Sequence, residues 1–242
     1  MEIRYRDVAE FEGWDSFPSF IEELAGAHSL YRVCEVGAGA NPALSPQFVQ
    51  DHGLLYRAID KSETEIGKSE MNGMSVFDIC SANSKLPGAP YDLICSRMTA
   101  EHFEEPRHAY ANMFMSLAPG GLCVHSFATL YSVPFLLNKL LPSVISDTVL
   151  NTVSPRDRDA HDKFKAYYRY CRGPLKSQTA FFETIGFEIL EYRGYFGHNY
   201  YHLKLPLLHL MERKETQILL RTPAACLTTY STVVLQRPVL ST

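Results

Sequence analysis

The 242-residue sequence lacks any apolar run near the roughly 20 residues that a membrane-spanning helix needs. It also lacks a Cys-x-x-Cys pair and any cysteine and histidine cluster at metal-ligand spacing, because its six cysteines are widely scattered. We therefore expect no membrane span, no structural metal and no disulfide framework. The first 17 residues contain no apolar segment of about 7 to 15 residues, which argues against a signal peptide and predicts a cytoplasmic location.

A strong net charge is missing as well. The formal charge is -4 and 46% of the residues are hydrophobic, as in an ordinary globular protein. This balance gives no global reason to expect a nucleic-acid partner. The chain also has no internal repeat and no Gly/Ser-rich linker. Its length and continuity favour one domain over residues 1–242, while the oligomeric state stays open.

Short apolar runs alternate with polar or helical segments along the chain. Runs typical of buried strands cover residues 31–36, 54–59, 74–79, 91–95, 122–127, 187–193 and 226–236. Helices are predicted at residues 17–29, 104–117, 177–186 and 206–220. This order is typical of a doubly wound α/β fold with a mostly parallel, seven-stranded sheet. A long segment after the fifth strand interrupts the pattern and is predicted to be a helical lid insertion.

A glycine-rich turn follows the first of these central strands. The segment VCEVGAGANP brings Glu35 to Gly37, Ala38 and Gly39, where the missing side chains would let a ligand approach the backbone. Asp60 ends the next strand, at a place where a carboxylate can accept hydrogen bonds from ribose hydroxyls. Asp78 ends the third strand. One such carboxylate alone is more often a cap or turn residue, but three at one sheet edge predict a nucleotide-type site.

A dinucleotide site is the weaker alternative for this turn. The Rossmann fingerprint needs a glycine three residues after Gly39, and that position is Pro42. Tyr200 and Lys204 have the YxxxK spacing of short-chain dehydrogenases, but they lie late in the chain beside Pro206. An NAD(P)-dependent oxidoreductase therefore stays a less favoured alternative.

With these motifs the chain resembles class I S-adenosylmethionine-dependent methyltransferases, and among them the ubiquinone-biosynthesis O-methyltransferase-like group. The resemblance covers roughly residues 32–127, with Asn41 in place of the last motif glycine and YDLICSRMTAEHFEEP as the fourth motif. It implies S-adenosyl-L-methionine as cofactor, S-adenosyl-L-homocysteine as product, and no metal. The cofactor contacts that it implies are Glu35, Gly37, Ala38, Gly39, Asn41, Asp60, Lys61, Asp78, Ile79, Ser96 and Arg97.

The resemblance also divides the domain and suggests how the reaction works. We expect an N-terminal helical segment (1–30), a cofactor-binding core (31–127), a lid or substrate insertion (128–180) and C-terminal strands and helix (181–242). A sulfonium methyl is already activated, so the enzyme mainly holds a nucleophile in line with it and excludes water. His102 and His125 are the candidate general bases, although the apolar neighbours of His125 favour a core histidine.

The acceptor is predicted to be a hydroxyl of a small or lipid-linked molecule, methylated by in-line displacement. A protein that binds the cofactor without transferring methyl is the alternative from another class. Residues 131–150 have 11 apolar residues of 20, and residues 155–176 have a local charge of +4. This combination favours a lid, with weak peripheral membrane contact as the alternative.

Aromatic residues are concentrated on the presumed acceptor side. Twelve of the 29 aromatic residues lie between residues 164 and 201, interleaved with arginine and histidine. Core filling is the commoner role of such residues, but neighbouring tyrosines cannot all point inward. The predicted substrate contacts are Tyr167, Tyr168, Arg169, His198, Tyr200 and Tyr201. No RNA-binding signature accompanies them, so nucleic acid is not expected as a partner.

Overall fold

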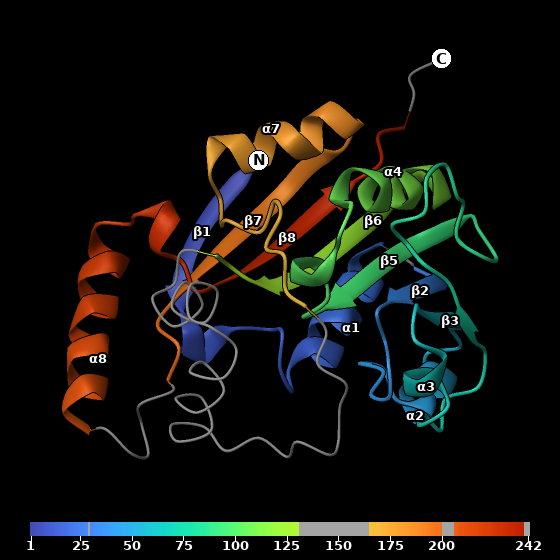
Figure 1. Ribbon diagram of the computed structural model, residues 1–242, viewed down its shortest axis with the longest axis horizontal. Helices are drawn as coiled ribbons and strands as arrows, with labels where there is room; N and C mark the ends of the chain where they lie inside the picture. The colour runs from blue at the N-terminus through green and yellow to red at the C-terminus, as the bar shows by residue number, and fades with distance from the viewer. Residues whose placement is uncertain (29, 131–164, 200–205, 240–242) are drawn as a thin grey trace.

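The computed structural model describes residues 1–28, 30–130, 165–199 and 206–239, which form one eight-stranded sheet with helices packed around it (Figure 1). Its spatial order is β1-β7-β8-β6-β5-β2-β3-β4. The strands are β1 (Glu2–Asp7), β2 (Arg32–Val36), β3 (Leu55–Asp60), β4 (Met74–Val76), β5 (Tyr91–Arg97), β6 (Leu117–Ala128), β7 (Glu188–Phe196) and β8 (Tyr230–Gln236).

Parallel pairing dominates this sheet. β4, β3, β2, β5 and β6 pair with one another in parallel, whereas β8 runs antiparallel to both β6 and β7. The carboxyl ends of β2, β3, β4 and β5 therefore meet at one edge, where ligands bind in open α/β sheets. The doubly wound, mostly parallel fold predicted from the sequence is confirmed.

The predicted count of seven strands is wrong, because the N-terminal segment starts as a strand and not as a helix. β1 pairs in parallel with β7, from Glu2 opposite Glu191 to Asp7 opposite Phe196. Its charged side chains alternate with Ile3 and Tyr5, and they protect the outer edge of the sheet from further pairing. Such a charged pattern carries little of the apolar signal that marks the central strands.

Each face of the sheet is covered by its own helices. α4 (Pro106–Ser116) and α7 (Lys176–Ile185) cover one face, while α1 (Phe17–His28) and α2 (Pro46–Asp51) cover the other (Figure 1). Side chains along β2 point alternately to the two faces of the sheet. Val33 therefore packs in the cluster with α1, and Cys34 packs in the cluster with α4. These two apolar layers hold the central strands, and therefore the loops at their carboxyl ends, in fixed positions.

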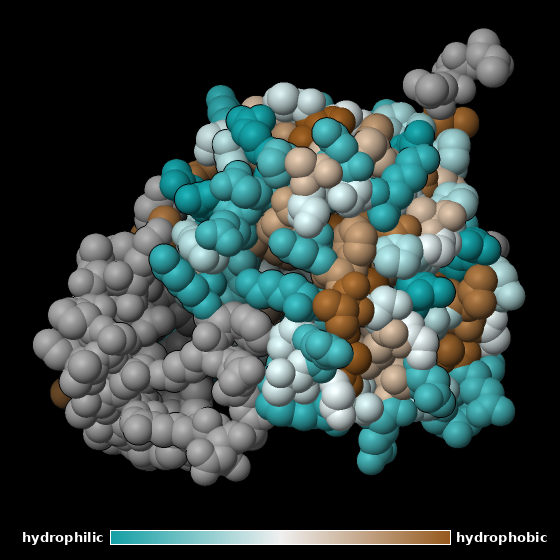
Figure 2. Space-filling model, turned by 45° about the vertical axis from the view of Figure 1, so that its right-hand side comes forward, coloured by the Kyte–Doolittle hydropathy of each residue, from teal (hydrophilic) through white to brown (hydrophobic). Residues whose placement is uncertain are grey.

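The remaining helices are α3 (Glu63–Ile66) and α8 (Pro206–Arg221), with short 3-10 turns at Val8–Glu10, Ala100–His102 and Ala225–Leu227. The last of these turns explains why β8 begins at Tyr230 and not at residue 226 as expected. Most of the predicted lid, residues 131–164, lies outside the described residues. Among the described residues no helix could span a membrane. On the face in Figure 2, hydrophobic residues form small groups among hydrophilic ones.

A candidate cofactor pocket at the carboxyl edge of the sheet

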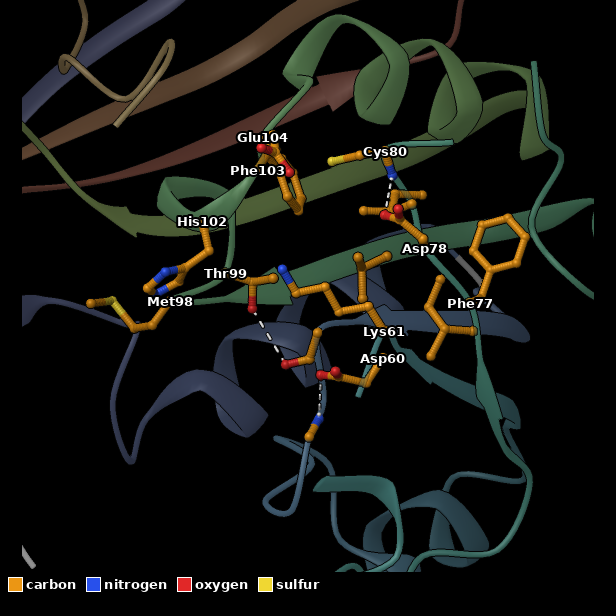
Figure 3. Close-up of a pocket in the computed structure, with 15 residues that line it drawn as sticks. Asp60, Lys61, Phe77, Asp78, Cys80, Met98, Thr99, His102, Phe103 and Glu104 are labelled. Atoms are coloured by element: carbon orange, nitrogen blue, oxygen red, sulfur yellow. Dashed lines mark hydrogen bonds between the residues drawn. The ribbon is translucent and has the colours of Figure 1, made fainter. Parts of the chain in front are cut away.

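A cavity opens at the carboxyl ends of β2, β3, β4 and β5 (Figure 3). Its volume is about 840 Å³, part of which is open to solvent. The lining residues are Val36, Gly37, Gly39, Ile59, Asp60, Lys61, Phe77, Asp78, Ile79, Cys80, Met98, Thr99, His102, Phe103 and Glu104.

The glycine turn forms one wall of the cavity. Gly37 has φ +73°, and a Cβ there would lie 2.1 Å from Cγ2 of Thr99, so only glycine fits. The amides of Gly37 and Ala38 donate to the carbonyl of Ile59, at 2.8 and 3.3 Å. The amide of Gly39 donates to Oδ2 of Asp60 at 3.0 Å. Three successive N–H groups of the turn are thus bonded within the protein, unlike those of a phosphate-binding loop.

Glu35 faces the interior and does not line the cavity. Both of its carboxylate oxygens accept from the amide of Ala43, at 2.9 and 3.0 Å, and Oε2 also accepts from the hydroxyl of Tyr56 at 2.5 Å. Burial raises the pKa of Glu35. The carboxylate joins the start of the glycine turn to Ala43 at its end, and the structure does not place it at the cavity, where the predicted contact would require it.

Two other residues of the first motif, Ala38 and Asn41, do not line the cavity either. The carbonyl of Asn41 accepts from the guanidinium of Arg97 at 3.2 Å, which joins the turn to the end of β5. Arg97 is likewise absent from the lining, so none of these three predicted cofactor contacts lies at the cavity.

The predicted carboxylates at the strand ends do reach the cavity. Oδ1 of Asp60 accepts from the amide of Ser62 at 2.8 Å, and Oδ1 of Asp78 accepts from the amide of Cys80 at 2.9 Å. Lys61 and Ile79, also predicted, line the cavity as well, and Lys61 lies next to Asp60 (Figure 3). An ionised carboxylate accepts about four hydrogen bonds, so Asp60 and Asp78 retain acceptor capacity for hydroxyl or amino groups of a ligand.

The lining is acidic. Asp60, Asp78 and Glu104 contribute three carboxylates, against the single ammonium of Lys61. With a neutral histidine, the lining therefore has a formal charge of -2. Such a cavity attracts a cationic ligand and repels a polyanionic one, because the field inside a narrow cleft follows the sign of its walls.

His102 brings an imidazole to the wall opposite Asp60 (Figure 3). Its Nδ1 lies 3.1 Å from the carbonyl oxygen of Lys165. A carbonyl can only accept, so Nδ1 carries the proton and Nε2 becomes the basic nitrogen of the ring. Burial lowers the pKa of His102, which keeps the ring neutral at physiological pH. Both properties suit a general base.

Ser96 and His125, in contrast, lie in the core. They are paired neighbours on β5 and β6, both are fully buried, and neither lines the cavity. Nδ1 of His125 lies 2.7 Å from Oγ of Ser96, and its Nε2 lies 3.0 Å from Sγ of Cys123. Burial lowers the pKa of His125 to about 3. The structure does not support the predicted catalytic role of His125 or the predicted cofactor contact of Ser96.

His125 makes stability depend on pH. Its folded pKa lies below the unfolded value of 6.5, so its contribution is complete above pH 6.5 and is lost as pH falls toward 3. We expect this residue to remove about 2 kcal/mol from the free energy of unfolding between pH 6.5 and 5. Urea denaturation of wild type and His125→Asn at several pH values measures this. The same dependence of the free energy of unfolding on pH in both proteins would contradict the assignment.

The predicted substrate residues are only partly brought together. Tyr167 and Arg169 do not line the cavity, but they donate to its lining residue Glu104 through the Tyr167 hydroxyl (3.2 Å) and the Arg169 guanidinium (2.5 Å). Tyr168 is buried in the core, and the backbone amide of His198 donates to Glu212 of α8 at 2.6 Å. Tyr200 and Tyr201 lie outside the described residues.

Sequence reasoning missed several lining residues, chiefly Met98, Thr99, Phe77, Phe103 and Glu104. Four of them fall inside the YDLICSRMTAEHFEEP motif, so the motif located the wall without identifying its members. Phe77 directly precedes Asp78, and that proximity was the available signal. Among the described residues, no group of three or more His, Cys, Asp or Glu side chains is placed to hold a metal ion.

The topology, glycine turn and strand-end carboxylates define a Rossmann-like, nucleotide-binding α/β protein. The model of a family described as a methyltransferase domain matches residues 9–192. This is more than half of the chain, which therefore belongs to the methyltransferase domain family.

Solved structures with this fold are distant in sequence. An S-adenosylmethionine-dependent methyltransferase from Clostridium acetobutylicum is 11% identical (TM-score 0.53), with 95% of this chain and 92% of that chain covered. An S-adenosylmethionine-dependent methyltransferase from Mesorhizobium loti is 16% identical (TM-score 0.51), with 94% of this chain and 100% of that chain covered. Phosphoethanolamine N-methyltransferase 2 of Haemonchus contortus, solved with phosphomonomethylethanolamine and S-adenosylhomocysteine, is 14% identical (0.58; 93% and 53%). Such low identities establish a common fold only. No curated protein sequence matches significantly.

Proposed function

We propose that the protein is an S-adenosylmethionine-dependent methyltransferase that acts on a hydroxyl of a small or lipid-linked acceptor. The observation that supports the cofactor best is the charge and bonding of the cavity. Its lining has three carboxylates against one lysine, and the amides of the glycine turn are bonded internally. This environment suits a nucleoside with a sulfonium and an ammonium group, and it opposes the pyrophosphate of NAD(P).

The residues present fit the parts of this cofactor. Asp60 has acceptor capacity for the ribose hydroxyls, and Asp78 has it for the adenine amino group. Phe77 and Ile79 offer apolar surface for the base, and Gly37 and Gly39 leave room for the methionine end. When bound, the cofactor supplies an electrophilic methyl group on sulfur.

His102 would receive the proton in this reaction. The bound cofactor would supply the methyl group, and a hydroxyl acceptor would lose its proton as its oxygen takes up that group. The acceptor proton passes to Nε2 of His102, whose tautomer is fixed by the Lys165 carbonyl. Tyr167 and Arg169, which contact the lining residue Glu104, are the proposed acceptor contacts.

Transfer of labelled methyl from S-adenosylmethionine to a panel of small and lipid-linked hydroxyl compounds tests this function. Label in at least one hydroxyl compound is the expected result. Bound cofactor without transfer to any panel member would favour the binding-only alternative. Label found only on amines would contradict the hydroxyl acceptor and, with it, a relation to the ubiquinone-biosynthesis group.

We propose that residues 1–242 form one domain. We also propose that the protein contacts anionic membranes weakly. Outward apolar side chains on α8, Leu207 and Met211 among them, and exposed Lys165 and Lys176 support the contact. We expect co-sedimentation with phosphatidylserine vesicles at low salt, and a several-fold loss at 0.5 M salt or in the double variant Leu207→Ser/Met211→Ser. Leu55→Ser, at another exposed leucine, is the control. Equal binding by the double variant and wild type would contradict this contact.

A further inference from the structure

The 3-10 turn Ala100–His102 contains a buried carboxyl group that the proposed reaction does not use. Glu101 is 3% exposed, and its Oε2 has no hydrogen-bond partner among the described residues. A buried carboxyl with one oxygen left without a hydrogen-bond partner is costly, so its position beside His102 requires an explanation. Groups of this kind concentrate at functional sites.

The backbone of this turn is joined to the segment that returns from the insertion. The carbonyl of Glu101 accepts from the amides of Tyr167 and Tyr168, at 2.8 and 3.0 Å. The adjacent His102 donates from Nδ1 to the carbonyl of Lys165. The turn and residues 165–168 thus exchange hydrogen bonds in both directions. A movement of the Glu101 backbone would therefore disturb the bond that orients His102.

No described charge compensates the Glu101 carboxylate. The titratable groups that face it are the hydroxyl of Tyr110 from α4 and the thiol of Cys171 from the returning segment. Burial raises the pKa of both, so both are neutral, and the Tyr110 hydroxyl also has no described hydrogen-bond partner. Among the described residues, two backbone amides donate to the carboxyl group, its own and that of Ala128 on β6, and neither carries a charge. A protonated Glu101 fits these surroundings, whereas an ionised one is an unpaired buried charge.

We propose that Glu101 is a positioning residue for methyl transfer, whose protonated side chain keeps the Ala100–His102 turn closed against residues 165–168 and so holds His102 in place. The inference rests on the proposed function only in the role given to His102. Burial raises the pKa of Glu101 to about 7. Its contribution to the closed turn is complete below the unfolded pKa of about 4.5 and is lost as pH rises to 7.

Amide hydrogen exchange tests this without an acceptor. Between pH 5 and 7.5, after correction for intrinsic exchange rates, protection of the Tyr167 and Tyr168 amides should fall tenfold or more in wild type. In Glu101→Gln, which cannot ionise, we expect less than a threefold change. Glu183→Gln, at an exposed carboxylate on α7, should behave as wild type. A pH-independent wild type, or an equal loss in Glu101→Gln, would overturn the proposal.

A second measurement covers the case in which Glu101→Gln fails to fold. The Cε1–H resonance of His102, assigned with His102→Asn, should show an extra inflection near pH 7 in wild type and in Glu183→Gln. A curve with the His102 titration alone would overturn the proposal. S-adenosylhomocysteine binding, measured separately by calorimetry, tests the proposed function, so the two failures are distinguishable.

Discussion

Replacement of Asp60 by alanine is expected to weaken S-adenosylhomocysteine binding by about 100-fold, or about 3 kcal/mol. The substitution removes the proposed ribose acceptor, and hydrogen bonds to charged groups contribute about 1.5–3 kcal/mol each. It also releases the amides of Gly39 and Ser62, which loosens the turn beside the ligand. Isothermal titration calorimetry of the folded variant measures the effect.

Two further variants make this result specific. Asp60→Asn keeps the shape and one acceptor oxygen, so we expect an intermediate loss of about tenfold. Asp51→Ala removes an exposed carboxylate at the end of α2, and its affinity should equal that of wild type. A loss below threefold in Asp60→Ala would contradict the ribose assignment.

His102→Asn is expected to lower kcat by about 10²- to 10⁴-fold, the usual contribution of a general base. Cofactor affinity should change less than threefold, because Asp60, Asp78 and the glycine turn remain. Steady-state kinetics with an acceptor identified from the panel, together with calorimetry, separate the two quantities.

His52→Asn is the matched control for this variant. Nδ1 of His52 also lies at hydrogen-bond distance from a backbone carbonyl, that of Phe48 at 2.9 Å, but the residue is exposed and outside the cavity. Its turnover should equal that of wild type. Turnover within threefold of wild type in His102→Asn would mean that the acceptor arrives deprotonated or that another group accepts the proton.

Local patterns predicted the central strands because burial on both faces makes them continuous apolar runs. The segment before Gly37 and the segment before Asp60 are examples, and both carry ligand-facing residues at their carboxyl ends. β1 was not predicted because its charged residues protect an edge of the sheet and because its pairing with β7 spans nearly 190 residues of sequence. The order of the strands in the sheet likewise determines at which edge the cavity lies.

The site was predictable where one turn or one strand end determines the contact, as for Gly37, Gly39, Asp60 and Asp78. The site was not predictable where a side chain near a strand end can point either into the cavity or into the core. Glu35 points to Ala43 and Tyr56, and Ser96 points to His125, because strand packing places these side chains inside the protein. Their sequence neighbours gave no means of distinguishing the two directions.

We propose that the acidic cavity holds S-adenosylmethionine and not a dinucleotide. Calorimetric titration of wild-type protein with S-adenosylmethionine, and separately with NAD⁺, tests it most directly. We predict saturable heat with one site for S-adenosylmethionine and no saturable heat for NAD⁺. Saturation by NAD⁺ alone, or by neither ligand, would contradict the account.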